Sequence, residues 1–147
     1  MSLSPIFVYT YDTNCKVAFC LVYYLLFYKY MKEIKIGSRI KVCKMSELAS
    51  DEQRLIEMAK KATDNSYSPY SHFKVGAAIR LGDGTEIIGA NQENAAFSVT
   101  MCAERSAIFA AMTQYPDQPI TQLAIAARNE NGFMAEPTAP CGSCRQV

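Results

Sequence analysis

The chain has 147 residues, with 15 Lys or Arg against 14 Asp or Glu and a formal net charge of +1. This length suits a single domain, and the small charge gives no electrostatic footprint for nucleic acid or an anionic membrane. Half of the residues are hydrophobic and 20% are charged, which excludes a chain that is disordered throughout.

The first 30 residues differ in composition from the rest of the chain. They contain nine of the 16 aromatic residues (nine Tyr and seven Phe in all). Residues 17–28 form an uncharged apolar run (VAFCLVYYLLFY) that is shorter than the roughly 20 residues of a membrane-spanning helix. Residues 29–32 (KYMK) offer no small-residue cleavage site of a signal peptide. We therefore expect residues 1–30 to be an apolar leader outside the domain, with translation beginning at Met31 and the domain spanning residues 31–147.

The patterns that follow predict a helix and then a hairpin. Apolar residues recur at helical spacing over residues 50–63, which predicts an amphipathic helix that begins with a capping box of Ser50 and Gln53. Two short apolar runs, residues 75–81 and 85–91, flank a Gly-Asp-Gly sequence and predict a β-hairpin.

The second half of the chain returns to a helix, a strand and a further helix start. Residues 103–114 are Ala-rich and are followed by prolines, which predicts a helix. Residues 123–127 form a continuous apolar run that predicts a strand buried on both faces. A Cys-Gly-Ser-Cys sequence, residues 141–144, opens another helix shortly before the chain ends. The order predicts an α/β fold, a three-layer α-β-α arrangement with a mixed sheet, incomplete at its C-terminus.

Three of the six cysteines stand where helices are predicted to begin. Cys102 precedes one helix, and Cys141 and Cys144 open another, where free N–H groups and the helix dipole favour the thiolate. Three converging thiolates make a good zinc site, and three protein ligands leave the fourth position open to water, as in catalytic zinc sites. Alternatives are a redox-active cysteine pair, or a closed structural site with His72, the only histidine, as the fourth ligand. Cys43 lies apart in an apparent strand and is expected to be a small buried residue.

Glu104 and Arg105 follow Cys102 on the first turn of the same predicted helix. A carboxylate at this point is placed to take a proton from water that zinc activates and to return it to a substrate. Three thiolates give a zinc site a net negative charge, which Arg105 and the helix dipoles would offset.

The sequences Cys102-Ala-Glu and Pro140-Cys-x-x-Cys together form the zinc-deaminase signature. Through these and two further segments, the chain resembles the small homo-oligomeric cytidine deaminases that act on free nucleosides. The likeness covers residues 67–147 and extends more weakly back to Met31. The matching segments are residues 70–78 (YSHFKVGAA), 91–95 (NQENA), 102–105 (CAER) and 140–147 (PCGSCRQV).

The resemblance implies a role for each matching residue at the metal. Cys102, Cys141 and Cys144 would hold one Zn²⁺ per chain, the implied cofactor. Glu104 would be the catalytic residue that shuttles protons, and Arg105 would support the metal ligands.

The resemblance also implies residues that bind the substrate. Asn91 and Glu93 would hold the ribose hydroxyls, and Phe73 would pack against the pyrimidine ring. Phe97 matches a position that the family uses near a neighbouring subunit's site. Asn91 and Glu93 are two residues apart near the end of a predicted strand, so their side chains are expected to point the same way.

The implied activity is the hydrolytic deamination of cytidine or deoxycytidine to uridine or deoxyuridine and ammonia, a reaction of pyrimidine salvage. A cysteine at position 102, where nucleotide and polynucleotide deaminases have histidine, favours free cytidine or deoxycytidine as the partner. The neutral body of the chain agrees, so neither nucleic acid nor a membrane is expected as a partner. The implied setting is a cytoplasmic homotetramer.

Two alternatives remain open at this stage. One is an aminonucleoside-antibiotic deaminase of the same fold, and the other is a non-catalytic fragment that binds zinc or a nucleoside. Because members of the family continue beyond the point that matches Val147 with further strands and helix, the expectation is a truncated chain whose assembly and activity suffer.

Overall fold

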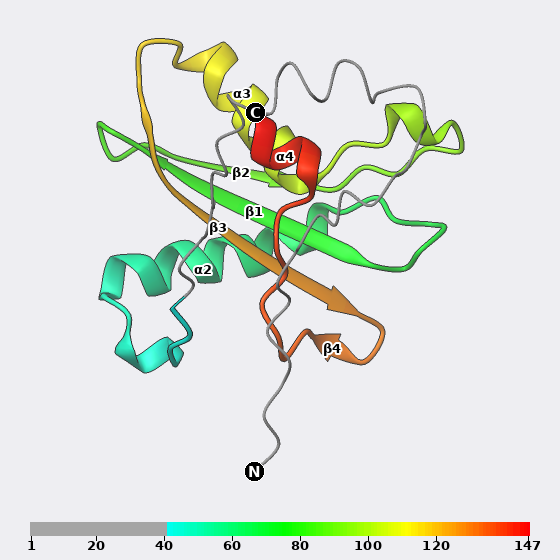
Figure 1. Ribbon diagram of the computed structural model, residues 1–147, viewed down its shortest axis with the longest axis horizontal. Helices are drawn as coiled ribbons and strands as arrows, with labels where there is room; N and C mark the ends of the chain where they lie inside the picture. Colours follow the sequence, from blue (N-terminus) through cyan, green and yellow to red (C-terminus); the bar gives the residue numbers. More distant parts are fainter. Residues whose placement is uncertain (1–40) are drawn as a thin grey trace, which may run out of the picture. The chain divides into compact units, whose positions relative to one another are not determined.

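The computed structural model of the protein describes residues 41–147 (Figure 1). The leader expected over residues 1–30 and the domain start expected at residue 31 lie outside this part of the chain. In order, the elements are the 3-10 turn η2 (Met45–Glu47), α2 (Ser50–Ala62), η3 (Thr63–Asn65), β1 (Lys74–Leu81), β2 (Glu86–Ala90), η4 (Phe97–Val99), α3 (Ala103–Gln114), β3 (Ile120–Asn129), β4 (Gly132–Phe133) and α4 (Gly142–Gln146). Over residues 41–147, no helix combines the length and the apolar character needed to cross a membrane.

The sheet has the strand order β2-β1-β3-β4. β1 and β2 form the predicted hairpin, whose turn contains Gly84 in a left-handed conformation with a φ of 87° that favours glycine. β3 then pairs with the other edge of β1 and also runs antiparallel to it. The expected mixed sheet is therefore wrong for the described strands, which are antiparallel in all three pairings. The reason is that α3 returns the chain across β1, so the parallel strands β2 and β3 are not neighbours.

Helices cover both faces of this sheet, as the alternation of side chains along β1 shows. Ala77, Ile79 and Leu81 form one buried cluster with residues of α3. Ala78 points to the opposite face, where it forms a second cluster with residues of α2. Because successive residues of a strand face opposite sides, one strand supplies both cores. The predicted three-layer α/β fold is confirmed.

Two glycines let the helices approach the strands closely. A Cβ atom on Gly76 would lie 2.1 Å from the carbonyl oxygen of Ala59 in α2. A Cβ atom on Gly89 would lie 2.4 Å from the backbone nitrogen of Ala107 in α3. Only glycine fits such an approach of two backbones. The contact at Gly89 therefore holds α3 against β2. It places the start of α3 beside the end of β2.

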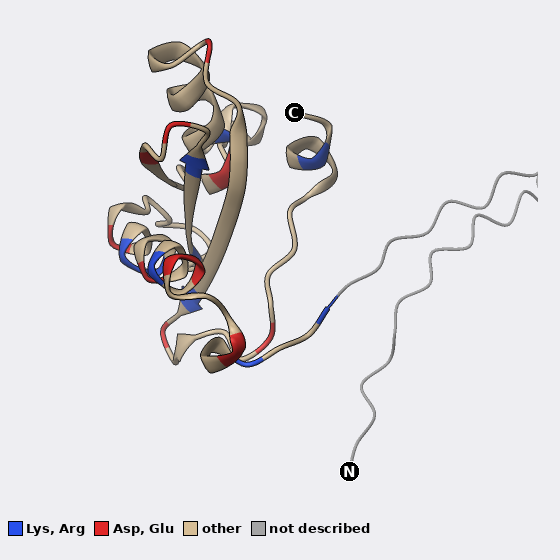
Figure 2. Cartoon of the chain, turned by 90° about the vertical axis from the view of Figure 1, so that its left-hand side faces the viewer, with Lys and Arg blue, Asp and Glu red and all other residues tan. Residues whose placement is uncertain are grey.

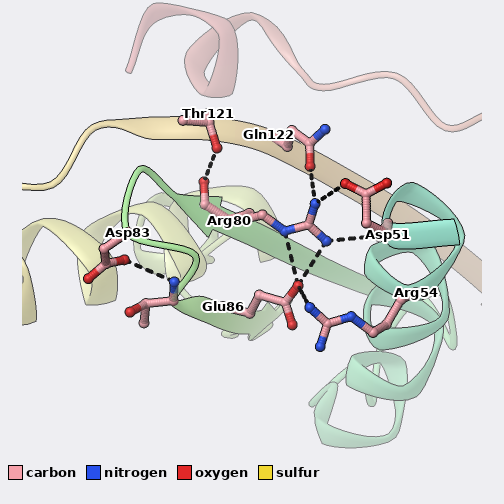
Figure 3. A network of polar contacts seen from close by, with 8 residues as sticks. Asp51, Arg54, Arg80, Asp83, Glu86, Thr121 and Gln122 are labelled. Atoms are coloured by element: carbon pink, nitrogen blue, oxygen red, sulfur yellow. Dashed lines mark hydrogen bonds and ion pairs between the residues drawn. The ribbon is translucent and has the colours of Figure 1, made fainter. Parts of the chain in front are cut away.

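A polar network joins α2 to three strands at the far end of β1 (Figure 3). The guanidinium of Arg80 in β1 donates to Asp51 at 2.7 Å, to Glu86 at 2.9 Å and to Gln122 at 2.6 Å. Arg54 donates to the same oxygen of Glu86 at 2.7 Å. The side chains of Arg80 and Glu86 are only 13% and 9% exposed. Each buried charge in this network therefore has an opposite partner.

Several local expectations are corrected by the structure. The helix over residues 50–63 is confirmed within one residue, but its start is closed by Glu52, whose carboxylate accepts from the backbone N–H of Ala49 at 3.0 Å. The strand expected around Cys43 is absent from residues 41–44, and Cys43 is exposed. Leu123 is 40% exposed because α3 packs on β1 and β2 rather than over β3, so β3 is not buried on both faces there. β4 was not predicted, because it is two residues long.

Candidate metal centre and active site

Three cysteine side chains come together at the starts of two helices. Cys102 is the residue that precedes α3, and Cys141 is the residue that precedes α4. Cys144 lies in the first turn of α4 and is only 7% exposed. The ligand atoms of the three cysteines all lie within 4.8 Å of one another. The convergence that the sequence predicted for these residues is therefore present.

The spacing of the three sulfur atoms fits a zinc ion. The Sγ atom of Cys141 lies 3.8 Å from that of Cys102 and 3.3 Å from that of Cys144. Zn–S bonds of about 2.3 Å in tetrahedral geometry place two sulfur atoms about 3.8 Å apart, which the Cys102–Cys141 pair matches, while the closer Cys141–Cys144 pair would open slightly around the ion. His72 does not belong to this group of potential ligands in the described residues, so the closed site with histidine is not supported. A third thiol beside Cys141 and Cys144 also favours metal binding over a redox pair.

The electrostatics of the cluster favour a bound cation. The backbone N–H of Cys144 donates to the Cys141 sulfur at 3.4 Å and lowers the pKa of that thiol. Burial raises the pKa of the Cys144 thiol to about 12, and hydrogen bonds with Cys141 and Cys102 act in the same direction. Arg105 donates to the Cys102 sulfur at 3.6 Å, and this contact raises the pKa of Arg105. A divalent cation would compensate three crowded thiolates, which a single arginine does not.

Glu104 is buried next to this cluster. It is the second residue of α3, and it is 5% exposed. Within residues 41–147 its carboxylate makes no hydrogen bond or ion pair. Its oxygens are not among the fully buried side-chain atoms without a partner in residues 41–147, so the carboxylate keeps a small opening beside the potential metal ligands, which suits a chemical role.

The segment that follows β2 lies directly beside the cysteine cluster. Gln92 and Met101 exchange two backbone hydrogen bonds of 2.9 Å, which places the residues on either side of Gln92 next to Cys102. On its other side this segment contacts residues 66–73, which we call the 66–73 loop. The backbone N–H of Tyr67 donates to the carbonyl of Asn91 at 3.0 Å.

Asn91 holds the 66–73 loop through its side-chain amide. Its Oδ1 atom accepts from the backbone N–H of Val75 at 2.8 Å and from the hydroxyl of Ser66 at 2.5 Å. Its Nδ2 atom donates to the carbonyl of Phe73 at 2.9 Å. The two acceptor positions of the amide oxygen are thereby filled, while one N–H of the amide has no partner among the described residues.

Glu93 holds the same loop through its carboxylate. Its Oε2 atom accepts from the backbone N–H groups of Tyr70 at 3.0 Å and Ser71 at 3.2 Å. Its Oε1 atom accepts from the hydroxyl of Ser71. The Ser71 hydroxyl, together with these N–H groups, holds the pKa of the Glu93 carboxyl below its usual range. The Asn91 and Glu93 side chains thus both bond to the 66–73 loop.

Phe73 and Phe97 differ in exposure. Phe73 is half-buried at the end of the 66–73 loop. Phe97 lies in η4 between the Glu93 segment and Cys102, and it is 87% exposed. The sequence analysis did not single out Ser66 or Ser71. Ser71 belonged to a matched segment, but a loop hydroxyl becomes informative only when its partner 22 residues away is known.

Comparison with known proteins agrees with this geometry. Residues 49–147 match the family described as "Cytidine and deoxycytidylate deaminase zinc-binding region". The chain belongs to this family. This membership confirms the resemblance predicted from the four sequence segments, and together with the three converging cysteines it confirms zinc as the expected cofactor.

Relatives within the deaminase family cover about two thirds of the chain. A cytidine deaminase of Halalkalibacterium halodurans is 43% identical over 97 residues, which are 66% of this chain and 69% of that protein. A cytidine deaminase of Sporosarcina psychrophila is 45% identical over 97 residues, 66% of this chain and 67% of that protein. Among these relatives nothing favours the antibiotic deaminase or the non-catalytic fragment.

Solved structures of the deaminase family share the fold. The crystal structure of cytidine deaminase from Burkholderia pseudomallei is similar with a TM-score of 0.57 and 42% identity, covering 63% of this chain and 70% of that chain. Cytidine deaminase from Mycobacterium tuberculosis is similar with a TM-score of 0.57 and 33% identity, covering 67% of this chain and 75% of that chain.

Proposed function

We propose that this chain is a zinc-dependent enzyme that deaminates free cytidine and deoxycytidine by hydrolysis, giving uridine or deoxyuridine and ammonia. The observation that carries the proposal is the buried, unpartnered carboxylate of Glu104 beside three cysteines spaced for zinc. This pairing of an acid–base group with an open metal site suits hydrolysis at an unsaturated carbon.

The metal ligands would be Cys102, Cys141 and Cys144. When bound there, zinc supplies Lewis acidity that makes water a competent nucleophile at neutral pH. Arg105 keeps its guanidinium on the Cys102 sulfur and offsets part of the negative charge of the ligand set.

Glu104 would carry the protons of the reaction. Its carboxylate takes a proton from the attacking water and delivers it to N3 of the pyrimidine ring, which makes C4 more electrophilic. It then takes the remaining proton from the hydroxyl group now on C4 and delivers it to the amino group, so that the C4–N bond breaks, the C4 carbonyl forms and ammonia leaves. Because the first turn of α3 buries this side chain and gives it no competing partner among the described residues, the carboxylate stays available for each transfer.

Asn91 and Glu93 would bind a ribose hydroxyl through the donor and acceptor positions that their bonds within the chain leave free. Asn91 retains one amide N–H, which donates to the hydroxyl oxygen. Glu93 retains an acceptor position on Oε1, which receives the hydroxyl proton. One hydroxyl is both donor and acceptor, so the two side chains are complementary to it. Phe73, at the end of the same loop, would pack against the base.

The assembly would be a homotetramer in the cytoplasm. α3 exposes Phe109 and Met112, and η4 exposes Phe97 and Val99. After its first turn α3 carries no charged residue, whereas α2 carries both signs of charge along its length (Figure 2). An uncharged face with exposed aromatic and sulfur side chains suits contact between subunits, and Phe97 would then lie close to a neighbouring site.

The test is product formation by the purified, zinc-loaded chain. Incubation with cytidine and with deoxycytidine should release uridine, deoxyuridine and equimolar ammonia, while cytidine monophosphate and an aminonucleoside antibiotic should be poor substrates. Cys102→Ser should remove both zinc and turnover. If the zinc-loaded chain releases no ammonia from either nucleoside, and a version extended with the C-terminal segment of a relative releases none either, the proposed function is wrong.

A further inference from the structure

We propose that Ser71 is a positioning residue for nucleoside binding, because its hydroxyl couples Glu93 to Phe73. This inference rests on the proposed function, in which Glu93 accepts from a ribose hydroxyl and Phe73 packs on the base. It assigns to Ser71 control over substrate affinity, and no part in the chemical step.

The coupling is visible in the two hydrogen bonds of one oxygen atom. The Ser71 hydroxyl donates to Oε1 of Glu93 and accepts from the backbone N–H of Phe73 at 3.0 Å. Oε1 is the same oxygen atom that keeps a free acceptor position for the substrate. The orientation of this oxygen atom and the backbone position of Phe73 therefore depend on one side chain.

A second clamp on Phe73 comes from Asn91. The carbonyl of Phe73 accepts from Asn91 Nδ2 at 2.9 Å, while its N–H donates to Ser71. The carbonyl of Phe73 is thus held by Asn91, and its N–H is held by Ser71, which in turn bonds to Glu93. Asn91 and Glu93 are the two residues that would bind ribose. Hydrogen bonds therefore link Asn91, Glu93 and Phe73 to one another, directly or through Ser71.

The backbone conformation of His72, between Ser71 and Phe73, depends on these hydrogen bonds. His72 has a φ of 56°, the only positive value among non-glycine residues of the described chain. Such a conformation is costly for a residue with a Cβ atom and persists where neighbouring contacts hold it. Two backbone donors would still reach Glu93 without the hydroxyl, but neither fixes the carboxylate oxygen that faces the substrate.

The hydrogen bonds of Ser71 go to Glu93 and Phe73, and none in the described residues joins it to Glu104 or to the three cysteines at the starts of α3 and α4. Loss of the hydroxyl should therefore weaken binding and spare the chemical step. Ser71→Ala should raise KM for cytidine about tenfold, as expected for a lost hydrogen bond to a charged group, with kcat within about twofold. Ser71→Thr keeps the hydroxyl and should restore KM. Ser46→Ala, which removes an exposed hydroxyl from η2, is the matched control and should change neither constant.

Two further readouts separate positioning from a general loss of structure. For 2′,3′-dideoxycytidine, which lacks the 2′ and 3′ hydroxyls, Ser71→Ala should raise KM by less than it does for cytidine, because only the contact of Phe73 with the base is then weakened. In a Glu93→Gln background the effect of Ser71→Ala should be smaller, because the charged partner is already lost and only the hydrogen bond to Phe73 remains to be removed. Equal effects on cytidine and the dideoxy analogue, or an undiminished effect in the Glu93→Gln background, would overturn the proposal.

A measurement without turnover keeps this inference distinct from the proposed function. Carbon-13 NMR titration of the Glu93 carboxyl group should give a higher pKa in Ser71→Ala than in the parent chain, and amide exchange at Phe73 should be faster. An unchanged titration and exchange rate would refute the role of Ser71 even if cytidine is deaminated. Absence of deamination with the shifted titration would instead reject the proposed function alone.

Discussion

At one end of β1, the guanidinium of Arg80 lies between α2 and the strands. It donates hydrogen bonds to Asp51, Glu86 and Gln122. Beside the other end, the carboxylate of Glu104 is buried with no partner in the described chain, and three thiols crowd against one another. Both regions bury ionisable groups, yet only the first one satisfies them with its own residues. In the first region the opposite charges offset the cost of desolvation. In the second region Arg105 Nε is buried without a partner among residues 41–147 and the three thiols lie within 4.8 Å of one another, which is expected where binding and catalysis use the unsatisfied groups.

Removal of a metal ligand should have the largest effect on this comparison. In Cys144→Ser, zinc content should fall from one equivalent per chain to nearly none, and turnover should fall to background, because two remaining sulfur atoms cannot hold the ion tightly. X-ray absorption of the parent should show three sulfur atoms and one lighter atom around zinc. A spectrum with four sulfur atoms would contradict an open catalytic position.

The position of the proposed metal ligand Cys102 depends on the contact of α3 with β2. Gly89→Ala places a Cβ atom 2.4 Å from the backbone of Ala107, so α3 must shift and carry Cys102 with it. We expect a loss of about 1–3 kcal/mol in the free energy of unfolding, measured by urea denaturation, and weaker zinc binding. Gly142→Ala is the control for stability, since its Cβ atom meets nothing within 4 Å. Equal stability of the two variants would contradict the close approach.

Breaking the charge network should affect stability and leave the metal site intact. In Arg80→Met, Glu86 keeps only Arg54 as a partner and Asp51 loses its ion pair. The midpoint of thermal unfolding should therefore fall, and the double variant Arg80→Met with Glu86→Gln should recover part of the loss. Zinc content should stay at one equivalent. Loss of zinc in Arg80→Met would show that the two regions are not independent.

The smallest effect concerns the pH dependence contributed by Glu93. Its pKa is lower in the folded chain than in the unfolded chain, chiefly through the Ser71 hydroxyl. A depressed carboxyl pKa stabilises the fold above the unfolded value of about 4.3 and loses this effect as the pH falls through the folded value. Glu93→Gln should therefore lower the unfolding midpoint at pH 7 but not at pH 3. An equal difference at both pH values would contradict this assignment.

Local sequence patterns predicted most of the elements, because their signals lie within a few residues. The Ala-rich run became α3 over Ala103–Gln114, and the Gly-Asp-Gly turn joined β1 to β2. Strand partners depend on contacts far apart in sequence, which explains why the antiparallel pairing of β3 with β1 was not foreseen. The exposure of Leu123 has the same origin, since it depends on which strands α3 covers.

In the candidate site, too, some residues were predicted from local sequence signals and others were not. Cysteines at helix starts are visible in sequence, because a helix start favours a thiolate and the motif fixes the spacing. The hydrogen bonds of the 66–73 loop are not visible, because Ser71 and Glu93 meet only after the hairpin has formed. The satisfied Arg80 network was also missed, since the partners of Arg80 lie 6 to 42 residues away from it and carry no motif.

The most direct test of the central claim is the Glu104→Gln variant of the zinc-loaded chain, measured for zinc content, unfolding midpoint and uridine production together. The amide keeps the size of the side chain but cannot carry a proton. If the unpartnered carboxylate serves catalysis, zinc should stay at one equivalent and the midpoint should be equal or higher. Turnover should fall at least about 100- to 10,000-fold, the usual contribution of general acid–base catalysis. Turnover within about threefold of the parent, or a clear fall in the unfolding midpoint, would contradict the account.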